Sequence, residues 1–361
     1  MFKFLKTIFE LLRDLIIPYF PFRLSRRYKF AFLVHSRNIN DIYKRFPLTQ
    51  KLPLSWILFW CRYSWPFIVS KIGGVVSKKD GREVIGYMIG FLMLPNQILK
   101  NKNVAIKKII QSIRLAEKLG ARMIGLGALT SSITNGGLDL VDKTKASLTN
   151  GNALATAVSF EHIKQLLEKI NKPNIKISIV GATGSIGQAL TKLLIREYPK
   201  YEYLLFGRTK ENLDNLIREL RTFSDKTRVS FFYNNLIPLK ETDLIIVTTA
   251  ASGAIIHPEH LRQGAIVYDT THPQNVSQEV IKKRPDVLLI NGGLIETIDL
   301  KSEFITKLSK GSVFSCLIET ILLSLEYRKE NFSLGKVGLD RVSEIYDLMK
   351  KYNFKPTDLR I

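Results

Sequence analysis

The stretch IKISIVGATGSIGQALTKLLIREYPKYEYLLFGRT, residues 175–209, decides the fold of this chain. It begins with a short β-branched run, 175–180, which is typical of a strand buried on both faces. After a glycine loop, apolar residues recur with helical spacing over 185–197, and a second apolar run follows at 203–206. This strand–helix–strand unit predicts an α/β protein built on a Rossmann-type, doubly wound parallel sheet.

The glycine loop predicts a dinucleotide site. Glycines in such a loop let the backbone approach a pyrophosphate and let the helix pack closely on its strand. The start of the helix then presents free N–H groups to the anion. The residues that we expect to contact the cofactor here are Gly181, Thr183, Gly184, Ser185, Ile186 and Gly187.

The end of the second strand indicates which dinucleotide is bound. An NAD site usually has an acidic residue there for the ribose 2′-hydroxyl, whereas this chain has Arg208, Thr209 and Lys210. Cations at this point suit a 2′-phosphate, so the sequence favours NADPH. The alternative is that Arg208 and Lys210 are simply solvated side chains at the start of the next helix.

Three later apolar runs, 243–248, 265–269 and 286–290, have the length of further buried strands. The carboxyl ends of parallel strands meet at one edge of such a sheet and form its ligand crevice. Residues just after these runs therefore join the expected cofactor site: Thr249, Ala250, Gly292 and Gly293.

Length and composition limit the class of protein. A chain of 361 residues is enough for about two domains with cores of their own. Its net charge of +22 favours acidic partners, such as anionic lipid or an acidic carrier protein. Nucleic acid is disfavoured, because the sequence has no zinc-ligand spacing and no RNA-binding signature, and we expect no metal. Two cysteines cannot form a disulfide framework, which favours a reducing, cytoplasmic compartment.

Residues 1–28 are expected to form a leader outside the two domains. Over 2–17 the sequence FKFLKTIFELLRDLII places its large apolar side chains on one side of a helix and its charged ones on the other. A basic cluster follows within 23–29, as expected beside an anionic membrane surface. We therefore expect residues 1–22 to hold the protein peripherally on a membrane. The alternative is that the helix buries its apolar side on its own domain or on a second subunit.

An α/β substrate domain is expected over 29–155, followed by the cofactor domain over 156–310 and C-terminal helices over 311–361. The apolar run 52–69 is nearly long enough to cross a bilayer. Arg62 and two prolines argue against a spanning helix, so we interpret this run as the entrance to an apolar pocket.

A hairpin and a loop of small and hydroxyl residues, for which a simple turn is the alternative, are expected later in the substrate domain. Strands are predicted at 72–76 and 84–94, around an Asp-Gly turn. The segment 121–137 reads as a strand that runs into small and hydroxyl residues, and such a loop lets a substrate approach the backbone. The candidate substrate residues are Ser131, Ser132, Gly151 and Asn152, of which the last two introduce a helix over 153–170.

Cys316, in SVFSCLIET, is the candidate nucleophile. It lies in the first turn of a predicted helix, where unpaired N–H groups and the helix dipole lower the pKa of a thiol. The alternative is a buried core cysteine, because its neighbours are apolar. Cys61 has no helix start nearby, so we expect it to be inert. No His or Asp is spaced to mark a catalytic triad with Cys316.

Six segments together resemble one family, the long-chain acyl-[acyl-carrier-protein] reductases of the cyanobacterial type. They are GATGSIG, LGALTSS, TNGN, INGGLIE, FSCLIETILL and NFSLG, and the likeness runs from about residue 29 to 356. The resemblance implies that Cys316 accepts the acyl chain from acyl-carrier protein or acyl-CoA, and that NADPH reduces the enzyme-bound thioester to a fatty aldehyde. Residues 1–28 lie outside the family pattern, and TNGG at 134–137 replaces an acidic stretch that is frequent in it.

Two other functions fit part of the sequence. A shikimate-type NADP-dependent dehydrogenase of a small polar acid shares the two-domain plan and the Arg-Thr cofactor signal. The Asn-x-Thr-x-Pro-x-Lys motif of that class is not found in this chain. The second alternative is a non-catalytic NADP-binding protein at a membrane, in which Cys316 belongs to the core.

Overall fold

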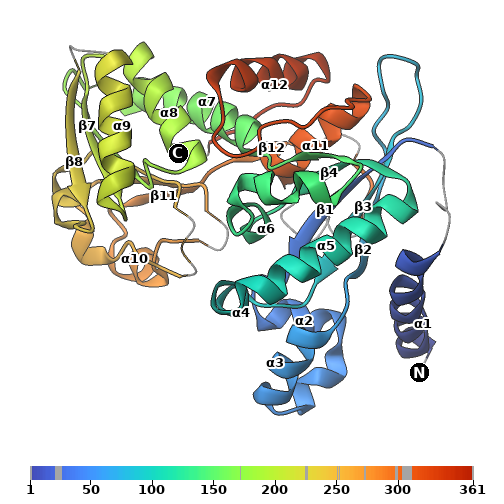
Figure 1. The fold of residues 1–361 in the computed structure, drawn as a ribbon. Coiled ribbons are helices and arrows are strands. Elements are labelled where there is room, and N and C mark those ends of the chain that lie inside the picture. Colours follow the sequence, from blue (N-terminus) through green and yellow to red (C-terminus); the bar gives the residue numbers. More distant parts are fainter. Residues whose placement is uncertain are drawn as a thin grey trace. The chain divides into compact units, whose positions relative to one another are not determined.

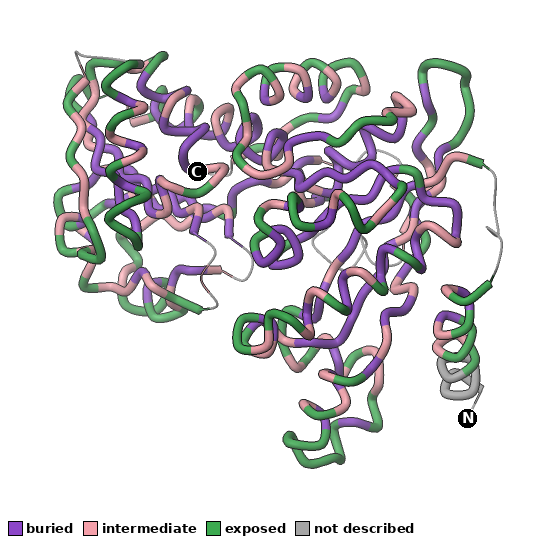
Figure 2. The backbone as a smooth tube through the Cα atoms, in the orientation of Figure 1, coloured by how far each residue is buried: buried purple, intermediate pink, exposed green. Residues whose placement is uncertain are grey.

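The computed structural model describes residues 2–20, 27–170, 172–223, 227–249, 251, 253–271, 274–296, 300–302 and 311–359 (Figure 1). The chain divides into two compact units. Unit 1 comprises residues 1–151, 296–335 and 348–354, and unit 2 comprises residues 152–295, 336–347 and 355–361. Each unit has its own sheet and its own hydrophobic core, and Figure 2 shows the buried backbone along the strands.

Unit 1 is built on a mixed five-stranded sheet in the order β2-β3-β1-β4-β5. β2 runs antiparallel to β3, whereas β3, β1, β4 and β5 pair in parallel. The strands are β1 (Lys29–His35), β2 (Phe67–Ile72), β3 (Ile85–Phe91), β4 (Ala121–Leu126) and β5 (Ser147–Thr149). The helices that precede unit 2 are α1 (Phe2–Ile16), α2 (Ile39–Arg45), α3 (Leu54–Tyr63), α4 (Pro95–Lys100), α5 (Lys102–Leu119) and α6 (Leu129–Ser132), with 3-10 turns at Ile17–Tyr19, Pro47–Lys51 and Asn135–Lys143.

Two helices cover the two faces of this sheet. The inner side of α5 packs on the face that carries Ala31, Leu33 and Ile124. The opposite face contacts α11 (Ser315–Leu325), because a Cβ on Gly125 would lie 2.0 Å from Oγ1 of Thr320. Side chains alternate along a strand, so helices on both faces explain why most residues of the parallel strands are buried. The C-terminal helix that carries Cys316 is therefore part of the core of unit 1.

The hairpin of unit 1 begins earlier than the sequence analysis placed it. β2 spans Phe67–Ile72, so the prediction of a strand at 72–76 was wrong, whereas β3 lies within the predicted second strand. Residues 73–84 form a looser extension, held by hydrogen bonds such as Val84 N–H to the carbonyl of Val75. Glycines at 73 and 74 shorten the regular strand, because glycine has low strand propensity.

The apolar run 52–69 is divided between α3 and the start of β2. In the described part of the chain, no helix is long and apolar enough to cross a bilayer. The outer side of α3 carries exposed aromatic side chains, so the structure does not support our interpretation of this run as the entrance to a pocket.

Unit 2 contains the predicted doubly wound sheet, six parallel strands in the order β11-β10-β9-β6-β7-β8. The strands are β6 (Lys176–Val180), β7 (Glu202–Gly207), β8 (Arg228–Tyr233), β9 (Leu244–Val247), β10 (Ile266–Asp269) and β11 (Leu288–Asn291). The helices are α7 (Asn152–Ile170), α8 (Ser185–Glu197), α9 (Lys210–Phe223) and α10 (Gln278–Lys283), with 3-10 turns at Ile237–Glu241 and Pro258–His260. The Rossmann-type α/β prediction is confirmed.

Some short elements were not predicted. β8 lies at the edge of its sheet and is half-exposed, so it has no continuous apolar run to reveal it. α4 and α10 have six residues each, which is less than two helical turns and too short for a periodic pattern.

The C-terminal part of the chain contributes to both units. β12 (Leu294–Glu296), β13 (Ser312–Phe314), α11 and α12 (Leu339–Lys351) follow β11. Residues 296–335 return to unit 1, which differs from the predicted separate segment 311–361. The physical reason is that α11 has buried side chains on every side and needs the face of β1 and β4 to cover it.

Candidate functional site

The glycine loop of unit 2 has the shape of a phosphate cradle. Gly181 has φ of +92°, and a Cβ there would lie 2.9 Å from the backbone nitrogen of Thr249. A Cβ on Gly187 would lie 2.3 Å from the carbonyl oxygen of Gly181. Both positions therefore exclude any side chain, so the loop presents its backbone rather than side chains. No side chain caps the first turn of α8, whose N–H groups are those expected to face a pyrophosphate.

The other predicted loop residues lie at the same turn. Gly184 is exposed, and Thr183, Ser185 and Ile186 are half-buried. The Ser185 hydroxyl accepts a hydrogen bond of 3.1 Å from the Val337 N–H, so it also fixes the start of α8 to another segment of unit 2. Ser185 therefore has a structural partner of its own.

The cationic stretch lies beside this cradle. β6 and β7 are neighbours, with Val180 opposite Phe206, so Gly181 and Arg208 follow two adjacent strands at one edge of the sheet. Arg208, Thr209 and Lys210 are exposed at the junction of β7 and α9. This is where the ribose of a dinucleotide lies in a Rossmann-type domain.

The remaining predicted cofactor residues lie after β9 and β11, except Ala250, which is outside the described residues. Thr249 is buried against Gly181. The Gly292 N–H donates to the carbonyl of Asp269 (2.7 Å), and the Gly293 N–H donates to Oη of Tyr268 (3.0 Å). Because both amides are already bonded within the protein, neither is available to a phosphate.

Two buried polar groups in unit 2 support this edge of the sheet. The Tyr268 hydroxyl lies 2.8 Å from Nδ1 of His162, whose Nε2–H donates to the carbonyl of Thr357 (2.9 Å). Burial lowers the pKa of His162, so its ring is neutral and Nδ1 accepts from Tyr268. Asp269 is also buried, which raises the pKa of its carboxyl, and it accepts hydrogen bonds from Thr271 and Asn275. These groups hold loops in place.

Cys316 is the second residue of α11 and lies against a glycine of unit 1. A Cβ on Gly151 would lie 2.2 Å from Cβ of Cys316 and 2.5 Å from its Cα. Gly151 has φ of +78°, a conformation that L side chains rarely adopt. The cysteine is half-buried, and the chain leaving β5 passes directly over it.

A buried carboxylate one helical turn further along completes this part of unit 1. Glu319 is 0% exposed, and its Oε1 lies within hydrogen-bonding distance of the Thr149 hydroxyl and 2.6 Å from the Ser333 hydroxyl. Ser333 also lies 2.9 Å from Oδ1 of Asn150, the residue before Gly151. This network ties α11 to the end of β5. The sequence analysis missed it, although a glutamate three residues after Cys316 places both on neighbouring positions of one helix.

The surroundings of Cys316 favour the neutral thiol. Burial raises the pKa of the Cys316 thiol to about 12, and the charge of Glu319 acts in the same direction. The N–H groups of Leu317 and Cys316 act in the opposite direction, as expected at a helix start, but are outweighed. The predicted position of the cysteine is confirmed, whereas the predicted lowering of its pKa was wrong because burial dominates.

The other candidate substrate residues lie near the same edge of the unit 1 sheet. Ser131 is buried and Ser132 exposed in α6, just after β4, and Asn152 begins α7. His35 ends β1 and is buried, which lowers its pKa. Its Nδ1–H donates to the carbonyl of Ser36 (2.9 Å), so Nε2 is the free acceptor and lies 3.4 Å from the Leu129 nitrogen. The imidazole is therefore neutral and orients the loop that carries the two serines.

Cys61 lies in a different environment from Cys316. It is buried in α3 among Ile57, Phe67 and Leu92, and burial raises the pKa of its thiol to about 11. It is an apolar core residue. No cluster of three or more His, Cys, Asp or Glu side chains able to hold a metal ion occurs among the described residues.

Comparison with known proteins relates unit 2 to a family of dehydrogenases. Residues 161–291 match the sequence model of the family described as shikimate / quinate 5-dehydrogenase. The solved structure of a shikimate 5-dehydrogenase from Listeria monocytogenes, in complex with shikimate and NAD, covers 91% of this chain and 99% of its own, with 11% identity and a TM-score of 0.35.

Two curated proteins are similar over most of the chain. The aminotransferase PigE of Serratia sp. is 29% identical over 278 residues, 75% of this chain. This match spans only 32% of the length of PigE. The long-chain acyl-[acyl-carrier-protein] reductase of Synechococcus elongatus is 25% identical over 319 residues, which are 82% of this chain and 89% of that protein. The chain is thus a distant relative of NAD(P)-dependent reductases, with an NAD(P)-binding domain in unit 2.

Proposed function

We propose that this protein reduces a long-chain fatty acyl thioester to a fatty aldehyde, using NADPH and an acyl intermediate on Cys316. The observation that carries the proposal is the contact between Cys316 and Gly151, which brings a half-buried thiol at a helix start under the backbone that leaves β5. The relationship to the Synechococcus elongatus reductase, over 89% of its length, supports the same assignment. The reaction also requires a hydride donor, and unit 2 carries the expected NADPH site.

The first step is transfer of the acyl group to the protein. The Cys316 thiol loses its proton, and its sulfur attacks the thioester carbonyl; the bond to the carrier sulfur breaks, and the carrier leaves as a thiol that takes up that proton. The raised pKa of Cys316 means that the thiolate is the minor form of this side chain. The Cys316 and Leu317 N–H groups, which face the sulfur, are the available donors for a developing oxyanion.

The second step releases the aldehyde. When bound, NADPH supplies a hydride to the carbonyl carbon of the acyl-cysteine. In that reduction the bond between the Cys316 sulfur and the acyl carbon would break, the sulfur would leave as thiolate and take up a proton from solvent, and the aldehyde would be released. In unit 2, the backbone at Gly181, Gly184 and Gly187 would hold the pyrophosphate, and Arg208 with Lys210 would hold the 2′-phosphate.

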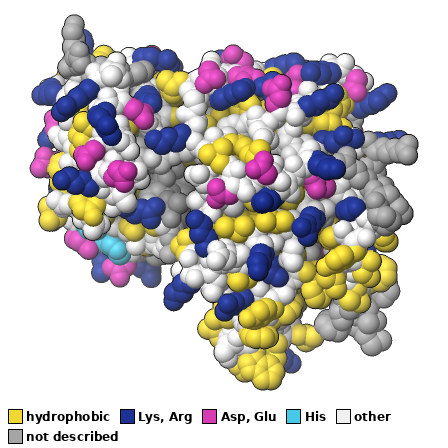
Figure 3. All heavy atoms as spheres, viewed as in Figure 1, with side chains coloured by type: hydrophobic (Ala, Val, Ile, Leu, Met, Phe, Trp, Pro, Cys, Tyr) yellow, Lys and Arg dark blue, Asp and Glu magenta, His cyan; other side chains and the backbone are white. Residues whose placement is uncertain are grey.

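The substrate carrier is proposed from charge. The net charge of +22 favours an acidic carrier, so acyl-carrier protein or acyl-CoA is the expected donor of the acyl chain. In Figure 3 Lys and Arg side chains are spread over the visible face of the molecule. Such a surface speeds association with an acidic partner without fixing one binding geometry.

A second candidate is a dehydrogenase of a small polar acid. It is favoured by the match of residues 161–291 to the shikimate / quinate 5-dehydrogenase family. That match lies in unit 2 and leaves the substrate residues of unit 1 unassigned. This candidate gives no role to Cys316.

One set of assays separates the two candidates. The purified chain is given acyl-carrier protein loaded with a long acyl chain and NADPH, and aldehyde and NADPH loss are both measured. We expect aldehyde from the parent protein, none from Cys316→Ser, and undiminished activity from Cys61→Ala, which changes the other cysteine of the chain. Oxidation of shikimate with NADP by both parent and Cys316→Ser would instead establish the dehydrogenase.

A further inference from the structure

α1 is held to unit 1 by its polar side. Asp14 is only 2% exposed, and its Oδ2 accepts a hydrogen bond of 2.7 Å from the Ile68 N–H. Glu10 pairs with Arg45 of α2 at 3.2 Å, and the Trp65 indole N–H donates to the carbonyl of Leu11 at 2.8 Å. The charged side of this amphipathic helix, which water would normally solvate, is therefore directed at the protein.

Part of the apolar side of α1 is directed away from the protein. Phe9 is 69% exposed, and Leu12 and Ile16, three and seven residues later, are exposed on the same side. Residues at this spacing share one helix face. These three side chains remain in water although the helix is docked, so a further partner is expected to cover them.

α3 packs on the same cluster by an apolar inner side and also has an apolar outer side. Its inner side chains, Ile57 and Cys61, are buried with Phe67, and Leu11 of α1 packs against that cluster. Its outer side carries Trp56, Phe59 and Tyr63, again at spacings of three and seven, with Trp56 69% exposed and Phe59 66% exposed. Two neighbouring helices thus share one core and both present apolar outer faces.

The exposed apolar surface of the protein is concentrated here. Among the described residues, eleven of the seventeen large hydrophobic side chains that are exposed belong to residues 9–63. Figure 3 shows hydrophobic side chains gathered at the end of unit 1 where α3 lies, with Lys and Arg beside them. The eleven, which we call the apolar face, are Phe9, Leu12, Ile16, Tyr19, Phe20, Leu48, Leu52, Leu54, Trp56, Phe59 and Tyr63.

The charge around the apolar face is positive. The acidic side chains near it form ion pairs with arginines: Glu10 with Arg45, Asp14 with Arg13 and Asp41 with Arg37. Lys44 at the end of α2 and Lys51 in the turn before α3 are exposed. An apolar surface with a cationic border and exposed Trp and Tyr matches the interface of an anionic bilayer, where aromatic rings settle at headgroup level.

We propose that α1 and α3 together form a docking surface for an anionic phospholipid bilayer, with both helices lying at the interface rather than crossing it. α3 is the new part of this surface, because the sequence analysis assigned membrane contact to residues 1–22 alone. The proposal does not depend on the reductase activity, since none of its residues belongs to the candidate site.

Vesicle binding by the full chain tests this directly. Co-sedimentation is measured with vesicles of phosphatidylcholine and phosphatidylglycerol at 3:1, and with phosphatidylcholine alone. The parent should bind the anionic vesicles, and the variant Phe9→Ser/Leu12→Ser/Trp56→Ser/Phe59→Ser should lose about 100-fold or more in partitioning. The matched control, Leu138→Ser/Tyr233→Ser/Ile237→Ser/Ile281→Ser, changes four exposed apolar side chains elsewhere and should bind like the parent.

The α1 part and the α3 part of the surface are tested separately. Phe9→Ser/Leu12→Ser and Trp56→Ser/Phe59→Ser should each weaken binding about tenfold, and Lys44→Glu/Lys51→Glu should weaken it for anionic vesicles only. Because all the changed side chains are exposed, circular dichroism should show parent-like folding. If the α3 pair binds like the parent, the two-helix surface is wrong and α1 alone is the anchor.

Intrinsic fluorescence gives a second readout that needs no variant to fold perfectly. All three tryptophans of the chain, at 56, 60 and 65, lie in or beside α3. Anionic vesicles should shift their emission to the blue, and Trp56→Phe should remove most of the shift. No shift, together with a parent dimer that dissociates in Trp56→Ser/Phe59→Ser, would show that a second copy of the chain covers the face and would overturn the proposal.

Discussion

Gly151 and Cys316 lie so close that a single methyl group on the glycine would overlap the cysteine, since its Cβ would be 2.2 Å from Cβ of Cys316. The candidate nucleophile is thus positioned by a backbone contact between the end of β5 and the start of α11. The contact depends on the absence of a side chain at Gly151, which also has φ of +78°.

Gly151→Ala should therefore displace Cys316 and abolish aldehyde formation, and should also cost roughly 1–3 kcal/mol of stability. Activity and urea unfolding are the two measurements. Gly81→Ala is the matched control, because Gly81 has φ of +69° but nothing within 4 Å of a Cβ. It carries the same backbone strain without the clash and should leave activity intact. Parent-like turnover of Gly151→Ala would show that the contact has no role.

Glu319→Gln should lower the pKa of Cys316, because it removes a negative charge that disfavours the thiolate. The amide oxygen can still accept from Thr149 and Ser333, so the network is largely retained. The pH profile of Cys316 alkylation by iodoacetamide should move to lower pH. Glu326→Gln, at the other end of α11, is the control and should leave that profile unchanged. A purely structural role for Glu319 predicts no shift in either variant.

Arg208→Ala/Lys210→Ala should remove most of the preference for NADPH over NADH. Two charge-assisted contacts to a 2′-phosphate are worth roughly 2–4 kcal/mol, which corresponds to about 30-fold or more in the ratio of kcat/KM values. Arg218→Ala changes an exposed cation further along α9 and should keep the preference. Equal use of NADH by the parent protein would contradict the assignment of NADPH.

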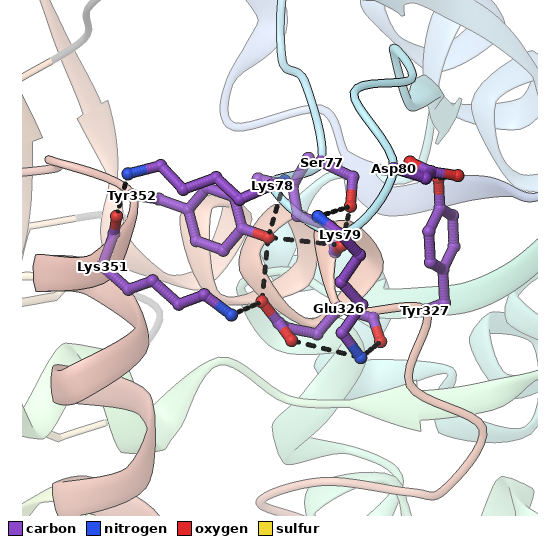
Figure 4. Close-up of polar contacts among 9 residues, drawn as sticks. Ser77, Lys78, Lys79, Asp80, Glu326, Tyr327, Lys351 and Tyr352 are labelled. Carbon is purple, nitrogen blue, oxygen red and sulfur yellow. Dashed lines mark hydrogen bonds and ion pairs between the residues drawn. The ribbon is translucent and has the colours of Figure 1, made fainter.

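Glu326 connects three segments of unit 1, as Figure 4 shows. Its carboxylate accepts hydrogen bonds from Lys351 (2.5 Å) and Tyr352 (2.8 Å) and pairs with Lys79 at 3.2 Å. Close by, the Ser77 hydroxyl donates to the carbonyl of Leu325 (2.6 Å). The hairpin 77–82 and the end of α12 are thereby fixed to the end of α11.

This cluster predicts a pH-dependent part of the stability. Burial opposes the charge of Glu326, but the hydrogen bonds from Lys351, Tyr352 and Lys79 outweigh it and lower its pKa below 4.5. The stabilisation is present above the unfolded-state pKa and is lost as pH falls through the lower, folded-state pKa. Glu326→Gln should cost about 1 kcal/mol in urea unfolding at pH 7, and this cost should shrink as the pH falls through the folded-state pKa. Glu279→Gln, which breaks an exposed pair with Lys283, should have little effect over the same pH range.

The salt dependence of KM should distinguish recognition of a charged carrier from recognition of the acyl chain. If the cationic surface docks acyl-carrier protein, the KM for the carrier-bound substrate should rise as the Debye length falls below about 10 Å. The KM for an uncharged thioester analogue should stay nearly constant. An equal response of both substrates would assign the net charge of +22 to another partner.

The sequence by itself determined the cofactor-binding fold. The run 175–209 contains β6, α8 and β7 with their connecting turns, because strand, glycine loop and amphipathic helix are all local patterns. It also placed Cys316 at a helix start, because residues 315–325 keep an apolar pattern after a break at Gly311. Glycines and apolar spacing act over a few residues, so they can be read without knowing the fold.

Tertiary structure decided what surrounds those residues. Only the return of α11 to the sheet of unit 1 brings Cys316 under Gly151, and burial, together with the charge of Glu319, raises the pKa of its thiol. The pairing of Glu319 with Thr149 and Ser333 joins segments up to 184 residues apart in the chain. The placement of α1 also depends on distant segments. Its amphipathic pattern is evident in the sequence, but its polar side faces the protein because Ile68, Trp65 and Arg45 provide hydrogen-bond and ion-pair partners. Burial and partner choice depend on contacts between distant segments, and no local pattern encodes them.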